Sequence, residues 1–222
     1  MEYKPDIVRR FLREGSINPS LENNYLIEWA GRNGHIDIFY SLLMDPRVNP
    51  EDTSNEKFSA LQSHEKTVRR MIEKQVKNRH IYNYTFEFAC KNGFIGVVRL
   101  LMAYSKVSPG DNNNLAIMCA SNSGHLEIVR LLLTDKRVDP AIGFNFPIQT
   151  ACQGGYHEIV KLLLSDSRVD PSDKNNESIC LALNHIEVVK LLLQDPRVDA
   201  SDAKSDDPEI QELLAQWKYH PR

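Results

Sequence analysis

Histidine and cysteine side chains are the groups of this chain whose spacing could support metal chemistry. Four histidines stand at equivalent places in four similar segments, namely His35, His64, His125 and His185. A protein zinc site needs several such ligands within ~2.0–2.3 Å of one ion. Histidines one segment apart lie too far from each other to share an ion. We therefore expect them to bond to nearby backbone and to orient the turns that they follow.

The cysteines are also spaced about one segment apart, at Cys90, Cys119, Cys152 and Cys180. This spacing contains no CxxC pair and no other short metal-ligand pattern. Cys90 and Cys152 fill equivalent positions two segments apart. At ~8–10 Å per packed helix layer, the distance between their Cα atoms exceeds the ~7 Å limit for a disulfide. We interpret the cysteines as small buried residues that stay reduced, and we predict no metal site.

Other catalytic patterns are not found in the sequence. It contains no G-x-S-x-G, P-loop, HExxH or Rossmann glycine motif. His80, His157 and His220 match no motif, and the adjacent acids Asp206 and Asp207 stand where a helix is expected to begin. We predict that the protein is not an enzyme and that it has no catalytic residues and no cofactor.

Composition narrows the class of protein and its partners. The chain has 222 residues, 41% of them hydrophobic, and a formal net charge of −3, so nothing favours nucleic acid or acidic lipid. The N-terminal stretch lacks the apolar core of a signal peptide, and no apolar run approaches the ~20 residues of a membrane span. These features predict an intracellular, cytoplasmic monomer with no membrane or nucleic-acid partner.

The segments that carry these residues recur with a period of 31 residues. A β-branched residue marks each link, at Ile17, Val48, Val76, Val107, Val138, Val169 and Val198. Seven positions after each of the first six stands an asparagine: Asn24, Asn55, Asn83, Asn114, Asn145 and Asn176. Self-similarity at a fixed period along the chain predicts a repeat architecture.

Each repeat has the pattern of two helices and a turn, as residues 114–144 illustrate. Asn114 is a strong N-cap candidate, because its side-chain oxygen can accept an orphan backbone N–H. Ile117 and Ala120 then share one helical face. Gly124 ends this first helix, and residues 128–133 form an apolar second helix that needs neighbours on both sides. Pro140 prevents helical continuation.

The stretch GHLEIVRLLL from Gly124, followed by a Val-Asp link, resembles the ankyrin repeat. Ankyrin units usually have about 33 residues, so these are shorter, and Pro147 alone keeps the proline of the family's T-P-L-H opening. The resemblance implies an all-α ankyrin-repeat solenoid of stacked helix-turn-helix units with short extended finger loops. Similar short units occur in ankyrin arrays of large DNA viruses and protists, which implies such a source and, for a virus, the host cytoplasm or nucleus.

The repeat register predicts one ankyrin-repeat domain over residues 1–222. Residues 1–23 form an N-terminal cap, and residues 205–222 form a C-terminal cap helix. The repeats between them are 24–54, 55–82, 83–113, 114–144, 145–175 and 176–204. Atypical ends of this kind are expected, because terminal repeats shield the stack from solvent.

The resemblance also implies a non-catalytic scaffold that binds a partner protein through its concave face. The partner-binding candidates are the aromatic and polar residues beside the core columns: Tyr25, Trp29, Arg32, Tyr82, Tyr84, Lys91, Asn92, Phe144 and Phe146. Aromatic and Arg side chains dominate interface energy. Tyr84 and Phe146 rank first, and the alternative is that these aromatics belong to the core.

A basic cluster in repeat 55–82 is a second candidate surface, formed by Lys66, Arg69, Arg70, Lys74 and Lys77. We favour a solvated outer helix face over a docking patch for an acidic partner. Two other functions remain open. The chain could be a substrate-recognition adaptor for a larger complex such as a ubiquitin ligase, or, less favoured, a small-molecule enzyme on an unusual solenoid.

Overall fold

The computed structural model describes part of the chain: residues 10–11, 14–16, 18, 38, 42, 47, 65, 68–69, 72, 79–104 and 107–219. The chain divides into two compact units, residues 1–81 and 82–222. Nearly all of the described residues belong to the second unit, and the following account concerns that unit.

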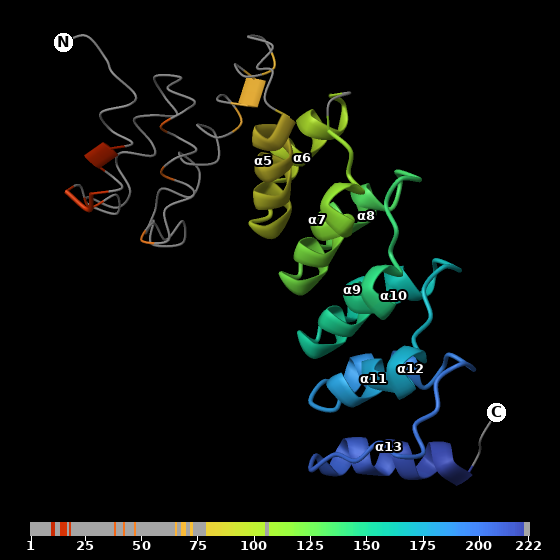
Figure 1. Ribbon diagram of the computed structural model, residues 1–222. Helices are drawn as coiled ribbons and strands as arrows, with labels where there is room; N and C mark the ends of the chain where they lie inside the picture. Colours follow the sequence, from red (N-terminus) through yellow and green to blue (C-terminus); the bar gives the residue numbers. More distant parts are fainter. Residues whose placement is uncertain are drawn as a thin grey trace. The chain divides into compact units, whose positions relative to one another are not determined.

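The second unit is a succession of helix pairs (Figure 1). The helices are α5 (Arg79–Lys91), α6 (Ile95–Met102), α7 (Asp111–Asn122), α8 (Leu126–Leu132), α9 (Ile142–Gln153), α10 (His157–Leu164), α11 (Asp173–Leu181), α12 (Ile186–Leu192) and α13 (Pro208–Tyr219). Residues 79–104 and 107–219 contain no β-strand.

The pairs stack in two layers. In one layer α7 packs on α9 and α9 on α11, while in the other α6 packs on α8, α8 on α10 and α10 on α12. The last helix, α13, packs against α12. Each pair therefore covers the apolar faces of its neighbours, which is the arrangement of an all-α repeat solenoid.

The core repeats with the sequence. Ile117 and Ala120 of α7 are buried, and so are Ile128, Val129 and Leu132 of α8. Equivalent residues are buried in α9 and α10, and burying one such aliphatic side chain contributes ~1.5–3 kcal/mol. The predicted all-α ankyrin fold and its apolar columns are confirmed in this unit.

A left-handed turn precedes the right-handed part of each of the helices α7, α9 and α11. Three successive residues have positive φ in each case: residues 112–114, 143–145 and 174–176. Left-handed backbone is disfavoured for most L-residues and accepted by Gly and Asn. These compact turns lead into the right-handed parts of α7, α9 and α11.

The predicted N-cap role of the asparagine column is wrong in these helices. The N-cap positions of α7, α9 and α11 are Gly110, Ala141 and Ser172, and none of them makes a side-chain cap hydrogen bond. Instead Asn114 Oδ1 accepts a hydrogen bond of 2.7 Å from the backbone N–H of Asp139, in the link that leads into α9. Asn145 binds Asp170 N in the same way at 2.8 Å. These asparagines thus have a structural role, as predicted, but they join a helix pair to the following link and do not cap a helix.

The links carry a second repeated contact, between an aspartate and the arginine two residues later. Arg168 makes a bidentate ion pair with Asp166, at 2.9 and 2.7 Å. Its Nη1 also donates to the carbonyl of Val138 in the preceding link, at 2.7 Å. Arg197 repeats both contacts with Asp195 and with Val169 O. We call this arrangement the Asp-x-Arg clip.

The histidine column contacts the glycine turn of the preceding pair. His125 Nε2 lies 2.9 Å from the carbonyl oxygen of Lys91, and His185 Nε2 lies 3.0 Å from that of Gln153. A Cβ on Gly93, which has φ +78°, would lie 2.8 Å from the His125 ring. The prediction that these histidines bond to backbone is confirmed for His125 and His185, whereas His35 and His64 lie outside the described residues.

The cysteines do not share one environment. Cys90 and Cys152 are buried, and burial raises the pKa of both thiols. Cys119 is half-buried and Cys180 is exposed. The prediction of buried cysteines is therefore wrong for Cys180, which stands on the side of α11 that faces away from the core. All four are free thiols.

Candidate functional site

We call α5, α7, α9 and α11, the first helix of each pair, the inner helices. Their sides that point away from the core form one face of the second unit. In α7 the residues Ala116, Ile117, Ala120 and Ser121 are buried. The helical period therefore turns Leu115 and Asn122 to the opposite side, where both are exposed. We define the inner-helix face as the exposed and half-buried side chains of α5, α7, α9 and α11 with the left-handed turns before them.

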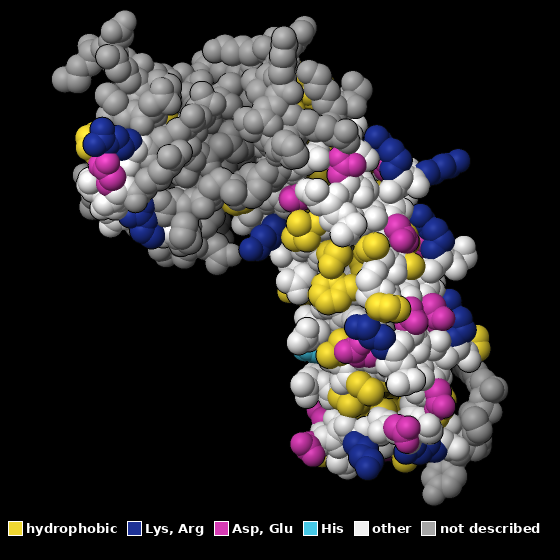
Figure 2. Space-filling view, viewed as in Figure 1, with side chains coloured by type: hydrophobic (Ala, Val, Ile, Leu, Met, Phe, Trp, Pro, Cys, Tyr) yellow, Lys and Arg dark blue, Asp and Glu magenta, His cyan; other side chains and the backbone are white. Residues whose placement is uncertain are grey.

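Apolar side chains gather on this face. Among the described residues from 79 onward, the exposed large hydrophobic side chains are Leu115, Phe144 and Phe146, with exposed fractions of 36%, 67% and 37%. Figure 2 shows hydrophobic side chains clustered over α7 and α9. Single exposed apolar residues are ordinary, but a contiguous group indicates an interaction surface.

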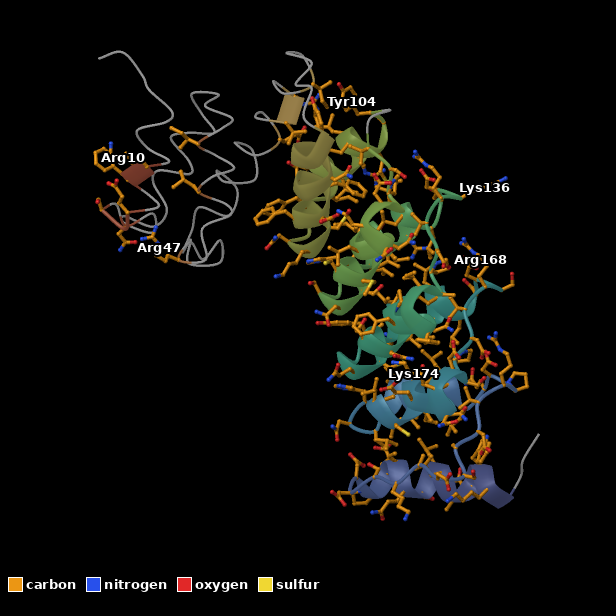
Figure 3. All side chains as sticks on the ribbon, in the orientation of Figure 1. Arg10, Arg47, Tyr104, Lys136, Arg168 and Lys174 are labelled. Carbon is orange, nitrogen blue, oxygen red and sulfur yellow. The ribbon has the colours of Figure 1, made fainter. Side chains whose placement is uncertain are left out.

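A basic side chain lies against the most exposed of these rings. Lys174, marked in Figure 3, stands in the left-handed turn at the start of α11. Its Nζ is 5.8 Å from the centroid of Phe144, within cation–π range. The same Nζ is 3.3 Å from Glu177 Oε2. The Lys174 charge is thus partly neutralised by its own helix.

An acidic group stands further along the same face, on α5. Glu87 Oε1 accepts a hydrogen bond from Asn112 Nδ2, in the turn that precedes α7. Burial raises the pKa of the Glu87 carboxyl, and this hydrogen bond opposes the rise. Lys91, one helical turn later, is exposed.

Tyr82 must be removed from the predicted surface. Its side chain is fully buried, its ring centroid lies 5.1 Å from that of Tyr104, and burial raises its pKa. The repeat register placed it beside the core columns, as the last residue of repeat 55–82. Helix α5 instead begins at Arg79, so residue 82 lies within a helical turn and points into the core.

The other candidates divide between exposed, engaged and undescribed side chains. Phe144, Phe146 and Lys91 are exposed. Asn92 is half-buried and donates to the carbonyl of Phe88 at 2.8 Å, which closes the end of α5. Four candidates lie outside the described residues or have side chains that are not described: Tyr25, Trp29, Arg32 and Tyr84.

The predicted basic cluster falls almost wholly outside the described part of the chain. Lys66, Arg70, Lys74 and Lys77 are not described. Arg69 is about half exposed, and its Nη2 is 2.7 Å from Glu65 Oε1 on the same helical turn. The role of this cluster stays a prediction.

Sequence reasoning missed three residues of this face, Glu87, Leu115 and Lys174, and for Leu115 a signal was present. Leu115 stands 31 positions before Phe146, and both are the first right-handed residue of an inner helix. The repeat register therefore contained the signal, because equivalent positions in neighbouring repeats come to lie side by side.

Stacked helix pairs with a repeated link define an α-solenoid repeat protein. The family model described as "Ankyrin repeats (3 copies)" matches residues 57–143 and 142–202, so the chain belongs to the ankyrin-repeat family. Ankyrin repeats are generally protein–protein interaction modules. A comparison with curated proteins finds no match.

Two features are absent from the part of the chain that the structure describes. It contains no group of three or more His, Cys, Asp or Glu side chains that could hold a metal ion. None of its helices combines the length and the apolar character that crossing a membrane requires.

Proposed function

We propose that this chain is a non-catalytic recognition module that binds a partner protein through the inner-helix face. One observation carries the proposal: among the described residues of the second unit, the exposed large apolar side chains all belong to that face. Exposing Phe144 and Phe146 to water is unfavourable, and a partner that covers them would recover that free energy.

The rigidity of the unit supports the same proposal. Asparagine, arginine and histidine bonds tie each helix pair to the next link or the next pair. A surface that is already ordered loses little conformational entropy when a partner binds. The module would act inside the cell, where free thiols such as Cys180 stay reduced.

The adaptor function is a narrower form of this proposal. An adaptor needs a second binding surface besides the inner-helix face. It could lie on α13 or on the layer formed by α6, α8, α10 and α12, which we call the outer layer. The outer layer is charged along one line, where Arg130, Lys161 and Lys190 follow one another on α8, α10 and α12. No contact of this kind is needed for the simpler module.

Site-specific photo-crosslinking separates these alternatives. A benzoylphenylalanine introduced at Phe146 should form adducts with a partner in cells that express the protein. The matched position is Lys161, which is exposed on α10. Adducts at 146 alone support the proposed function, and adducts at both positions support an adaptor. Adducts at 161 alone would move the binding surface to the outer layer.

A further inference from the structure

The left-handed turns are built almost entirely from residues that accept positive φ. Residues 112–114 are all asparagine, Gly143 and Asn145 flank the second turn, and Asn175 and Asn176 end the third. Glycine lacks the Cβ that clashes in this conformation, and asparagine tolerates it better than other side chains. Glycine and asparagine are therefore sufficient to form these left-handed turns.

Two residues break this pattern, and they contact each other. Phe144 has φ 60° and Lys174 has φ 50°, although neither residue type favours left-handed backbone. Lys174 Nζ lies 5.8 Å from the Phe144 ring centroid across neighbouring turns. Asn113 and Asn175, 31 residues on either side of Phe144, hold the same conformation, so the fold does not require an aromatic ring there.

Folding therefore gains little from Phe144. Its backbone is strained, and the residue is 67% exposed to water, so it buries little apolar surface. Strained residues that the fold does not need are concentrated at binding sites. Phe146, two residues later in the same helix, and Leu115 at the equivalent position of α7 are the other exposed large apolar residues described from residue 79 onward.

We propose that Phe144, with Lys174 against its ring, is an anchor for a short segment of a partner protein. This segment presents one apolar side chain to Phe144 and Phe146 and carries a lysine or arginine next to it. The proposal rests on the proposed function and assigns a chemistry to the partner.

The net negative charge of the inner-helix face favours a partner segment with a positive charge. Its described charged side chains are Glu87, Lys91, Asp111, Asp173, Lys174 and Glu177, four acids against two bases. Lys174 is already paired with Glu177. The chain as a whole has a net charge of −3. Complementary charge chiefly sets specificity and association rate, so a basic flank is favoured over an acidic one.

A random 12-residue peptide library displayed on phage and selected on the full chain provides the test. Selected peptides should carry an aromatic or aliphatic residue beside Lys or Arg. Acidic flanking residues, or no selected peptide at all, would overturn the proposed partner chemistry. The selected peptides are then synthesised and their affinities are measured by fluorescence anisotropy.

Phe144→Asn is the decisive variant, because it installs the residue that neighbouring turns use. It should weaken peptide binding at least tenfold while the protein unfolds at the same or a higher denaturant concentration. Unchanged affinity, or a marked loss of stability, would show that Phe144 serves the fold and not the partner.

Two further variants separate this inference from the proposed function. Phe146→Ala should also weaken binding, and if it does so while Phe144→Asn does not, the inner-helix face remains the site but the anchor is wrong. If neither variant matters, both proposals fail. Glu177→Gln should weaken binding severalfold and reduce its salt dependence, whereas Glu158→Gln on α10, an exposed site with the same charge change, should do neither.

Discussion

At the scale of single residues, the buried asparagines make the contact that ties a helix pair to the link after it. Asn145 has an exposed fraction of only 3% and uses both ends of its amide. Its Oδ1 accepts from Asp170 N at 2.8 Å, and its Nδ2 donates to Asp173 Oδ2 at 2.6 Å. Each contact lies in the segment that leads into α11.

We predict that Asn145→Ala is destabilising by about 1–3 kcal/mol, because it removes both hydrogen bonds of a buried amide and leaves the half-buried Asp170 N–H without its partner. The measurement is the denaturant midpoint of the full chain. Asn113→Ala is the matched control, since Asn113 is exposed and has the same left-handed backbone. Equal losses in both variants would mean that the strain of alanine in left-handed backbone explains the effect and that the hydrogen bonds of Asn145 contribute nothing.

Sequence reasoning located the important columns but not always their partners. The period placed Asn114, Gly124 and His125 at structural positions, and all three are structural. It misassigned the bond of Asn114, because local sequence names the nearest backbone N–H groups and not those that the following link brings within reach. Tyr82 was misplaced for a related reason: the start of α5 depends on packing that the repeat pattern does not contain.

At the scale of elements, the Asp-x-Arg clips hold the links between helix pairs. Hydrogen bonds from Arg168 lower the pKa of the Asp166 carboxyl, and Arg197 does the same for Asp195. A carboxyl whose pKa is lower in the folded state contributes stability above its unfolded pKa of ~3.9. That contribution disappears as the pH falls through the lower, folded pKa.

We predict that lowering the pH reduces the free energy of unfolding by weakening the clips. Replacing a clip arginine should make the free energy of unfolding depend less on pH. Arg168→Met should be destabilising by about 1 kcal/mol at neutral pH, a screened value for a partly exposed ion pair with one further hydrogen bond. As the pH falls below ~4 the difference from wild type should begin to shrink, because Asp166 of the unfolded chain takes up a proton first, and the difference should vanish once the pH has passed below the lowered pKa of folded Asp166. The check is a series of denaturant midpoints between pH 7 and 3. Arg130→Met, at an exposed position on α8, is the control, and a difference that stays constant with pH would contradict the clip.

At the scale of the whole molecule, the described unit is a stack whose cohesion depends on contacts between neighbours. Such proteins behave as one-dimensional arrays, in which a weak junction opens before the rest. The link before α7 differs from later links, since Tyr104 and Lys106 stand where Asp135 and Arg137 form an ion pair in the next one. In addition, Asn83 Oδ1 is buried without a hydrogen-bond partner.

We therefore predict that the α5–α6 pair opens at a lower free energy than the α9–α10 pair. Hydrogen exchange of the native full chain tests this, because it reports local opening residue by residue. The amides to compare are those of Val98 and Leu101 in α6 with those of Val160 and Leu163 in α10. These residues fill equivalent helical positions and are equally buried, with exposed fractions of 0%. Differences in exchange then reflect the strength of the junctions and not access to solvent. Faster exchange in α6 is the expected result, and equal protection in the two helices would mean that the clip and the asparagine contact do not govern the cohesion of the stack.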